Sequence, residues 1–280
     1  MGGEELPVML SMGRTGGFAG TGLGRAGGFV VAVIASLVLA GTPLSTTGQE
    51  PADEPTEKVS AAATPMDAVQ DLGGGNYELN GIRFNSRSRE IVLTGVVNLD
   101  DELLEYAIVN EKGAIHEALI RTTARPFDLQ IVLLLLRYQP FKGGLFEGFD
   151  RDAENAPVQS EGGSGEVEVP VSARLEIVLR WQEDGEEREA TLTSWIMDKV
   201  SGKVPEHGSW QFNGFPAPES VKYWKAEHES NMLGIYLNPY SPINWNHARN
   251  RSDDVWVPNR EVMPPVETPV QIIFRPFQKP

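Results

Sequence analysis

The sequence predicts an α+β fold, in which a mostly antiparallel β-sheet carries one buried helix packed on it. Three observations lead to this class. Apolar and polar residues alternate over several stretches after residue 76, turn-forming residues separate these stretches, and one short segment is apolar on every side. Alternation with a period of two is typical of strands with one buried face, and a short, wholly apolar segment indicates a buried element.

The first forty residues are interpreted as a secretion signal. An uncharged apolar run, residues 26–41, follows Arg25, and Val38 and Ala40 stand at the minus-three and minus-one positions of a cut before Gly41. This order of charged region, apolar core and small-residue cleavage site is typical of a secretory signal. The run is shorter than the roughly 20 apolar residues that span a bilayer, so an uncleaved N-terminal transmembrane anchor is the alternative. We therefore expect an extracytoplasmic protein, periplasmic or secreted, that meets a membrane only through an uncleaved leader.

A linker and one folded domain are expected to follow. Residues 41–75 are rich in Pro, Thr, Ala, Glu and Asp and contain almost no large apolar residue. Such a composition cannot bury enough surface to offset chain entropy, which predicts a disordered acidic linker. The domain is expected to occupy residues 76–280. Within it, residues 143–165 are glycine-rich and acidic without periodicity, which predicts an exposed loop.

Two hairpins are predicted at the start of the domain. In the first, residues 82–84 and 90–99 flank a polar turn.

In the second, residues 103–110 and 114–122 are joined by a three-residue loop that ends in Gly113, which can take the left-handed conformation of such loops. In an antiparallel pairing of these two strands, His116 points to the apolar face and Glu117 to the other.

A helix is expected to begin at Pro126. Proline suits the first turn, Asp128 complements the positive end of the helix, and residues 129–136 are almost wholly apolar. At roughly a dozen residues the segment is too short to span a bilayer, so it should be buried against the sheet.

The clearest strand comes after the loop, at residues 167–181, and the turn 183–186 returns it into residues 188–195. Further strand candidates are residues 209–212, 232–237 and 270–274.

Composition excludes several classes of function. The chain has 24 basic and 39 acidic residues, a formal net charge of −15, and no Lys/Arg cluster interleaved with aromatic residues, so nucleic acid is not an expected partner. The absence of Cys excludes disulfides, thiolate nucleophiles, Cys-ligated zinc and conventional iron–sulfur clusters. No cofactor and no metal site are predicted, and the expected partner is an unidentified protein or component of the cell envelope.

Several short motifs resemble those of a known family. They are Val97-Asn98-Leu99, Leu104-Glu105-Tyr106, Asn110-Glu111-Lys112-Gly113, His116-Glu117-Ala118-Leu119 and the segment 208–214, which is similar to a G-P-W-x-F-x-G motif with Ser209 where Pro is usual. In these features the chain resembles the YdjY-domain family of bacterial, often exported, proteins, for which no activity is established. The resemblance implies one continuous domain and export.

The histidines give only an incomplete catalytic signal. The zinc motif H-E-x-x-H starts at His116 and at His228 but lacks its second histidine at both places. His116 lies in the recognisable hairpin, where a buried histidine bonded to backbone is the ordinary interpretation and a base or ligand in a pocket is the functional one.

Two hypotheses follow from these residues. The first is an exported, non-catalytic binding or structural module of unknown ligand. The second is an extracytoplasmic hydrolase or metal-dependent enzyme centred on His116. No catalytic residue is assigned, and the candidate ligand-binding residues are His116, Glu117, Glu105 and Trp210.

Overall fold

The computed structural model describes residues 68–146, 168–206, 208–215, 225 and 228–278. The chain divides into two units, and every described residue belongs to the second of them, Val59–Pro280. The predicted secretion signal, most of the predicted linker and most of the predicted loop at 143–165 lie outside the described residues. None of the helices in the described part has the length and apolar character that a membrane span needs.

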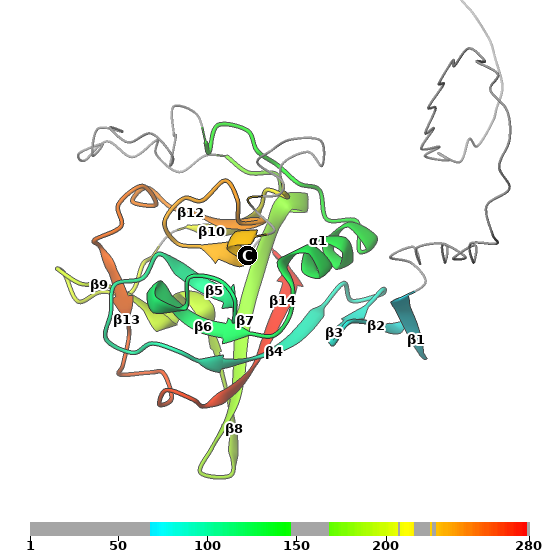
Figure 1. The fold of residues 1–280 in the computed structure, drawn as a ribbon, viewed down its shortest axis with the longest axis horizontal. Helices are drawn as coiled ribbons and strands as arrows, with labels where there is room; N and C mark the ends of the chain where they lie inside the picture. Colours follow the sequence, from blue (N-terminus) through cyan, green and yellow to red (C-terminus); the bar gives the residue numbers. More distant parts are fainter. Residues whose placement is uncertain (1–67, 147–167, 207, 216–224, 226–227, 279–280) are drawn as a thin grey trace, which may run out of the picture. The chain divides into compact units, whose positions relative to one another are not determined.

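The second unit is built on a closed β-barrel of eight strands (Figure 1). β6 pairs with β4 as well as with β5, and this pairing closes the ring. In order around the barrel, the strands are β4 (Ile91–Val97), β14 (Pro269–Pro276), β7 (Arg174–Glu183), β10 (Ser209–Phe212), β12 (Ile243–Asn246), β11 (Asn231–Gly234), β5 (Tyr106–Asn110) and β6 (Ala118–Thr122). The predicted α+β class is therefore wrong, because the sheet closes on itself and its inner face is covered by its own strands.

Further strands extend from this barrel. β1 (Val69–Gly73), β2 (Asn76–Leu79) and β3 (Ile82–Asn85) continue the sheet outward from β4, and β8 (Glu186–Thr191) forms a hairpin with β7. β9 (Ile196–Asp198) and β13 (Trp256–Pro258) make a separate two-stranded sheet. β1 lies inside the segment that was expected to be linker, so ordered structure begins earlier than predicted. Short 3₁₀ helices occur at Ile115–Glu117, Val171–Ala173 and Leu192–Trp195.

The helix α1 (Pro126–Leu135) begins at the predicted proline and directly follows β6 (Figure 1). Its inner side is buried, and the buried Asp128 carboxylate accepts a hydrogen bond of 3.1 Å from Asn80 Nδ2 in the β2–β3 turn. Leu134 and Leu135 are exposed, so the helix is not buried on all sides as expected. It lies against β3, and its buried side joins the main apolar core.

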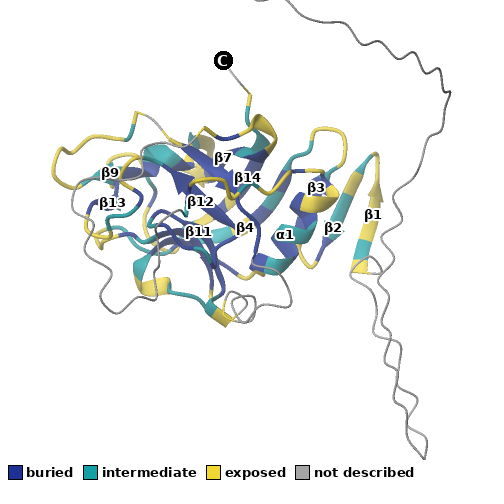
Figure 2. Ribbon diagram, turned by 90° about the horizontal axis from the view of Figure 1, so that it is seen from above, coloured by how far each residue is buried: buried dark blue, intermediate teal, exposed yellow. Residues whose placement is uncertain are grey.

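Apolar side chains from the strands and from α1 form one main core, visible as the buried centre of Figure 2. The strands alternate as predicted where one face meets water: Ile91, Leu93 and Val97 of β4 are buried, while Thr94 between them is exposed. In β10 and β12 both faces are buried, and on one face Gln211 and Asn244 donate to the carbonyls of the loop residues Phe141 and Ser241.

The second predicted hairpin is not a hairpin. β5 and β6 run parallel, with Tyr106 opposite Ala118 and Ile108 opposite Ile120. The connection 111–117 can extend about 23 Å, which is enough to return beside a five-residue strand of about 17 Å. Periodicity specifies which side chains face inward, and it is the same for either strand direction. β6 also pairs antiparallel with β4 along its other edge, a contact between segments that periodicity does not specify.

Candidate ligand-binding site

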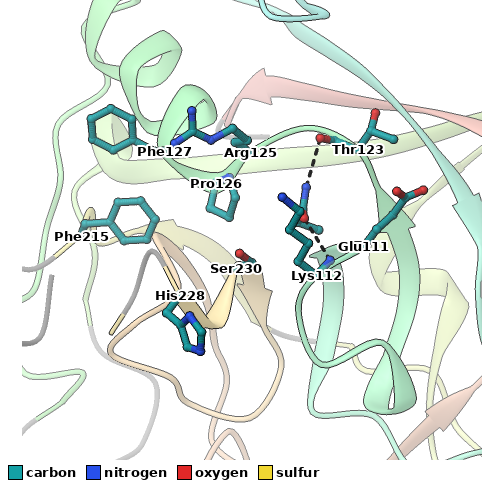
Figure 3. A pocket seen from close by; sticks show the side chains of 10 residues that line it. Glu111, Lys112, Thr123, Arg125, Pro126, Phe127, Phe215, His228 and Ser230 are labelled. Atoms are coloured by element: carbon teal, nitrogen blue, oxygen red, sulfur yellow. Dashed lines mark hydrogen bonds between the residues drawn. The ribbon is translucent and has the colours of Figure 1, made fainter. Parts of the chain in front are cut away.

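A cavity of about 700 Å³ lies where the ends of β5 and β6 meet the start of α1 and the segment before β11 (Figure 3). Its size falls in the range of small-molecule sites, about 300–1,000 Å³. It is lined by Asn110, Glu111, Lys112, Thr123, Arg125, Pro126, Phe127, Phe215, His228 and Ser230.

The parallel pairing of β5 and β6 creates this cavity. Parallel strands end at the same edge of a sheet, so the loop after β5 and the loop after β6 lie side by side. Asn110, which is 7% exposed, joins them. Its Nδ2 donates to the carbonyl oxygens of Thr123 at 3.1 Å and Ala124 at 2.9 Å, and its Oδ1 accepts from the Lys112 N–H at 3.0 Å. One buried amide therefore fixes the positions of both loops relative to each other.

The segment before β11 forms the opposite wall and packs tightly against the loop after β5. The Asn110 N–H donates to the Ser230 carbonyl at 3.0 Å, and the Ala114 N–H donates to Asn231 Oδ1 at 3.2 Å. A Cβ added to Gly113 would lie 2.8 Å from Asn231 Oδ1 and 3.0 Å from the Ser230 carbonyl oxygen. Gly113 has no left-handed φ, so it is needed for this close approach and not for the turn conformation that the sequence predicted.

Ser230 itself has a φ of 56°. A left-handed backbone at a non-glycine residue costs about 1–3 kcal/mol and persists only where its surroundings impose it. Here the hydrogen bond from Asn110 and the contact with Gly113 are those surroundings.

The charged side chains of the lining are mostly basic. Lys112, Arg125 and His228 come from three separate segments, and among the described residues Glu111 is the only acidic one in the lining. Figure 3 shows the Lys112 and Glu111 side chains extending in different directions, with Lys112 on the side of Pro126 and Arg125. α1 begins at Pro126 in the same wall, and Arg125 provides no side-chain cap there. Asp128 in the first turn already complements the positive end of the helix, so the basic character of this wall comes from its side chains.

Two aromatic rings complete the lining. Phe215 packs with Tyr240, and Phe127 packs against both. The backbone of Phe215 is held from two sides, because its N–H donates to Gln130 Oε1 and its carbonyl accepts from Lys142 Nζ at 3.2 Å. Burial lowers the pKa of Lys142. The described residues thus place a fixed apolar surface beside the basic wall.

Comparison with family models, with curated proteins and with solved structures finds no match to this chain. The similarity to the YdjY-domain family therefore remains a prediction.

The residues singled out from the sequence lie elsewhere. His116 is on the 3₁₀ helix Ile115–Glu117, and its side chain is 76% exposed. Its Nε2 lies 3.7 Å from Glu117 Oε1, so the predicted burial of His116 and the predicted separation of the two side chains are both wrong. Both errors follow from the strand direction, since residues 115–117 belong to the return connection and to neither strand.

Glu105 and Trp210 have different surroundings. The Glu105 N–H donates to the Glu117 carbonyl at 3.1 Å, so the structure brings the backbone of Glu105 next to the His116 segment. Trp210 is 3% exposed and stacks on Trp245 with ring centroids 5.8 Å apart. It borders a second cavity of about 300 Å³, and a third of about 470 Å³ lies by Tyr77 and Phe84. None of these three cavities is lined by His116, Glu117 or Glu105.

Sequence reasoning missed the residues that line the main cavity. Asn110, Lys112 and Gly113 stood in a recognised motif but were interpreted as a hairpin loop, and His228 was considered only as part of a failed zinc motif. Within the described residues, no group of three or more His, Asp or Glu is placed to hold a metal ion. The arrangement of Lys112, Arg125 and His228 is suited to binding a negatively charged group.

Proposed function

We propose that this chain is an exported, non-catalytic binding module that takes a small ligand in the cavity bordered by β5, β6 and α1. The observation that carries the proposal is the way the cavity is built. Its walls come from separate segments, and the buried Asn110 amide together with the Gly113 contact fixes those walls before any ligand arrives. A preformed cavity avoids the ordering cost that a flexible site would incur on binding.

The second hypothesis, an enzyme centred on His116, gains no support from the geometry. The His116 side chain is exposed, its neighbouring carboxylate is Glu117 at 3.7 Å, and the pair borders none of the three cavities considered. A general base acts within a site that holds the reacting atoms close to it.

The proposal is tested with a fragment library against the full chain, using thermal unfolding as the readout. A ligand that binds only the folded state raises the melting temperature by mass action. Thr123→Trp would fill the main cavity from its exposed rim, and Thr193→Trp would fill the second cavity as a matched control. We expect fragments whose stabilisation is lost with Thr123→Trp and kept with Thr193→Trp. Stabilisation that depends only on Thr193, or no stabilising fragment at all, would contradict the proposal.

The export part of the proposal rests on residues 26–41, which lie outside the described residues. Expression of the full chain with a C-terminal epitope in a bacterial host, followed by fractionation and N-terminal sequencing, tests it. We expect a periplasmic or secreted product that begins at Gly41. A full-length product in the membrane fraction would indicate the uncleaved anchor, and a cytoplasmic product would contradict export.

A further inference from the structure

We propose that the ligand of this cavity is an organic anion, in which a carboxylate or phosphate group is attached to an apolar or aromatic ring. The inference rests on the proposed function and specifies its ligand class. It is carried by the joint presence of a basic wall and an aromatic wall in one cavity of about 700 Å³.

The charge of the lining is opposite to that of the chain. The formal net charge of the chain is −15, whereas the described part of the lining contains Lys112 and Arg125 against Glu111, together with His228. Acidic residues are the most numerous charged groups in this sequence, so a cavity in which basic residues prevail is a local reversal. The basic side chains attract anions to the cavity, whereas the acidic residues elsewhere in the chain repel them.

The basic groups differ in how they would hold an anion. An Arg guanidinium offers a planar fork that matches both oxygens of a carboxylate or phosphate, while a Lys ammonium acts as a compact charge that adapts its position. Lys112 is held at its backbone by Asn110, and Arg125 immediately precedes α1. Figure 3 shows both side chains on the same side of the cavity as Pro126.

The aromatic wall indicates what the anion is attached to. Phe127 and Phe215 lie next to each other in Figure 3 and pack with Tyr240. The hydrogen bonds from Lys142 and to Gln130 hold Phe215 in place. Rings of this kind stack against a flat apolar group. A free phosphate or acetate ion would fill only a small part of a cavity of about 700 Å³ and would make no use of its aromatic wall, so the ligand must have a body as well as a charge.

The test is isothermal titration of the full chain with four probes. They are 1-naphthyl phosphate, 1-naphthoate, the neutral 1-naphthalenemethanol and inorganic phosphate. Comparison of the two anionic naphthyl probes shows whether the cavity prefers a phosphate or a carboxylate group. Lys112→Met removes the charge and keeps most of the side-chain volume, and Lys199→Met is the matched control at an exposed lysine outside the cavity.

We expect at least one anionic naphthyl probe to bind, and to bind more tightly than both the neutral probe and inorganic phosphate. Lys112→Met should weaken it about tenfold, as loss of a charged hydrogen-bond donor does, while Lys199→Met leaves it unchanged. The affinity of the neutral probe should not respond to either substitution.

The contrary results separate the two proposals. Equal binding of the neutral and anionic probes, or no effect of Lys112→Met, would contradict the proposal that the ligand is an anion. The proposal that the chain is a binding module would still stand. If inorganic phosphate binds as tightly as 1-naphthyl phosphate, the proposal that the ligand contains an apolar or aromatic ring is contradicted. If no probe binds although fragments stabilise the chain through the Thr123 cavity, the ligand class alone is wrong. If neither probes nor fragments bind, both proposals are wrong.

Discussion

Gly113→Ala tests the packing that builds the cavity. A methyl group at this position meets three oxygen atoms at once: Asn231 Oδ1 at 2.8 Å and the carbonyl oxygens of Glu229 and Ser230 at 3.0 Å. Two of the three belong to the backbone, so a rotation of one side chain cannot relieve the contact. The loop after β5 and the segment before β11 would have to move apart.

The required movement can be estimated from these contacts. Ordinary contact begins at 3.4 Å, so the two walls must separate by about 0.4–0.6 Å. Overpacking of this kind costs about 1–3 kcal/mol. Alanine also restricts the unfolded chain more than glycine does. Because Gly113 has no left-handed φ, this effect stabilises the folded state by about 0.4–1 kcal/mol. The expected net loss of stability is about 1–2 kcal/mol.

Guanidinium unfolding of the full chain, followed by tryptophan fluorescence, measures this loss, and titration with 1-naphthyl phosphate measures the site. Gly185→Ala is the control, because Gly185 has a φ of 83° and no atom near its missing Cβ. It should also lose about 1 kcal/mol, through backbone strain alone. Only Gly113→Ala should weaken binding as well, since it displaces Lys112 and Ser230.

A Gly113→Ala variant that unfolds at the wild-type denaturant concentration, or at a higher one, would refute the contact argument. The unfolded-state effect would then be the only one present. Destabilisation with unchanged binding would refute a narrower point, namely that the spacing of these two walls determines the site.

Three further predictions concern polar groups inside the second unit. Asn110→Ala leaves the carbonyls of Thr123 and Ala124 without their donor and the Lys112 N–H without its acceptor, and should cost about 2–4 kcal/mol in guanidinium unfolding and weaken naphthyl phosphate binding; an unaffected variant would contradict the role of Asn110. Burial raises the pKa of Tyr138 above its ordinary 10.0, so the unfolded phenol ionises first and stability should fall as the pH rises above about 10. The free energy of unfolding of Tyr138→Phe should fall less than that of the wild type between about pH 9 and 11, and an equal pH dependence of the two proteins would contradict this. The pKa of Asp198 is lowered by the hydrogen bond from the Ser201 N–H, and then by the Val200 N–H and the Arg249 guanidinium. The ionised carboxylate therefore contributes its full stability above pH 3.8, the ordinary pKa of the group. This stability is lost as the pH falls through the lower pKa of the folded state. Asp198→Asn should be less stable at neutral pH and flatter in an acid titration of unfolding, whereas parallel curves would contradict it.

Local signals in the sequence predicted the local structure. The turn at Asp184 and Gly185 has a positive φ at both residues and joins β7 to β8 as expected. The pairing of β3 with β4 and the start of α1 at Pro126 were likewise predicted from neighbouring residues. In each case the information lies within a few positions along the chain, because turn residues and the first helical turn have their own conformational preferences.

Closure of the barrel could not be predicted in this way. It depends on β14, which lies between β4 and β7 and pairs Ile272 with both Leu93 and Leu179. Alternation in β4 and β7 shows that one face of each is buried but does not say which strand lies beside which. β12 was missed for another reason. Its asparagines resemble turn residues, yet Asn244 is buried and donates to Asn213 Oδ1 at 3.2 Å beneath the covering loops.

The candidate site was missed because of a single error of direction. An antiparallel hairpin would leave the loop after β5 at one end of the pair and the start of α1 about 17 Å away at the other, a strand length apart. Asn110 could not then reach the carbonyls of Thr123 and Ala124. The parallel pair places both loops at one edge, and the pairing of β11 with β5 brings His228 and Ser230 to the same edge from more distant sequence. Residues 110–113 therefore form one wall of a cavity, although as a sequence they have every feature of a hairpin turn.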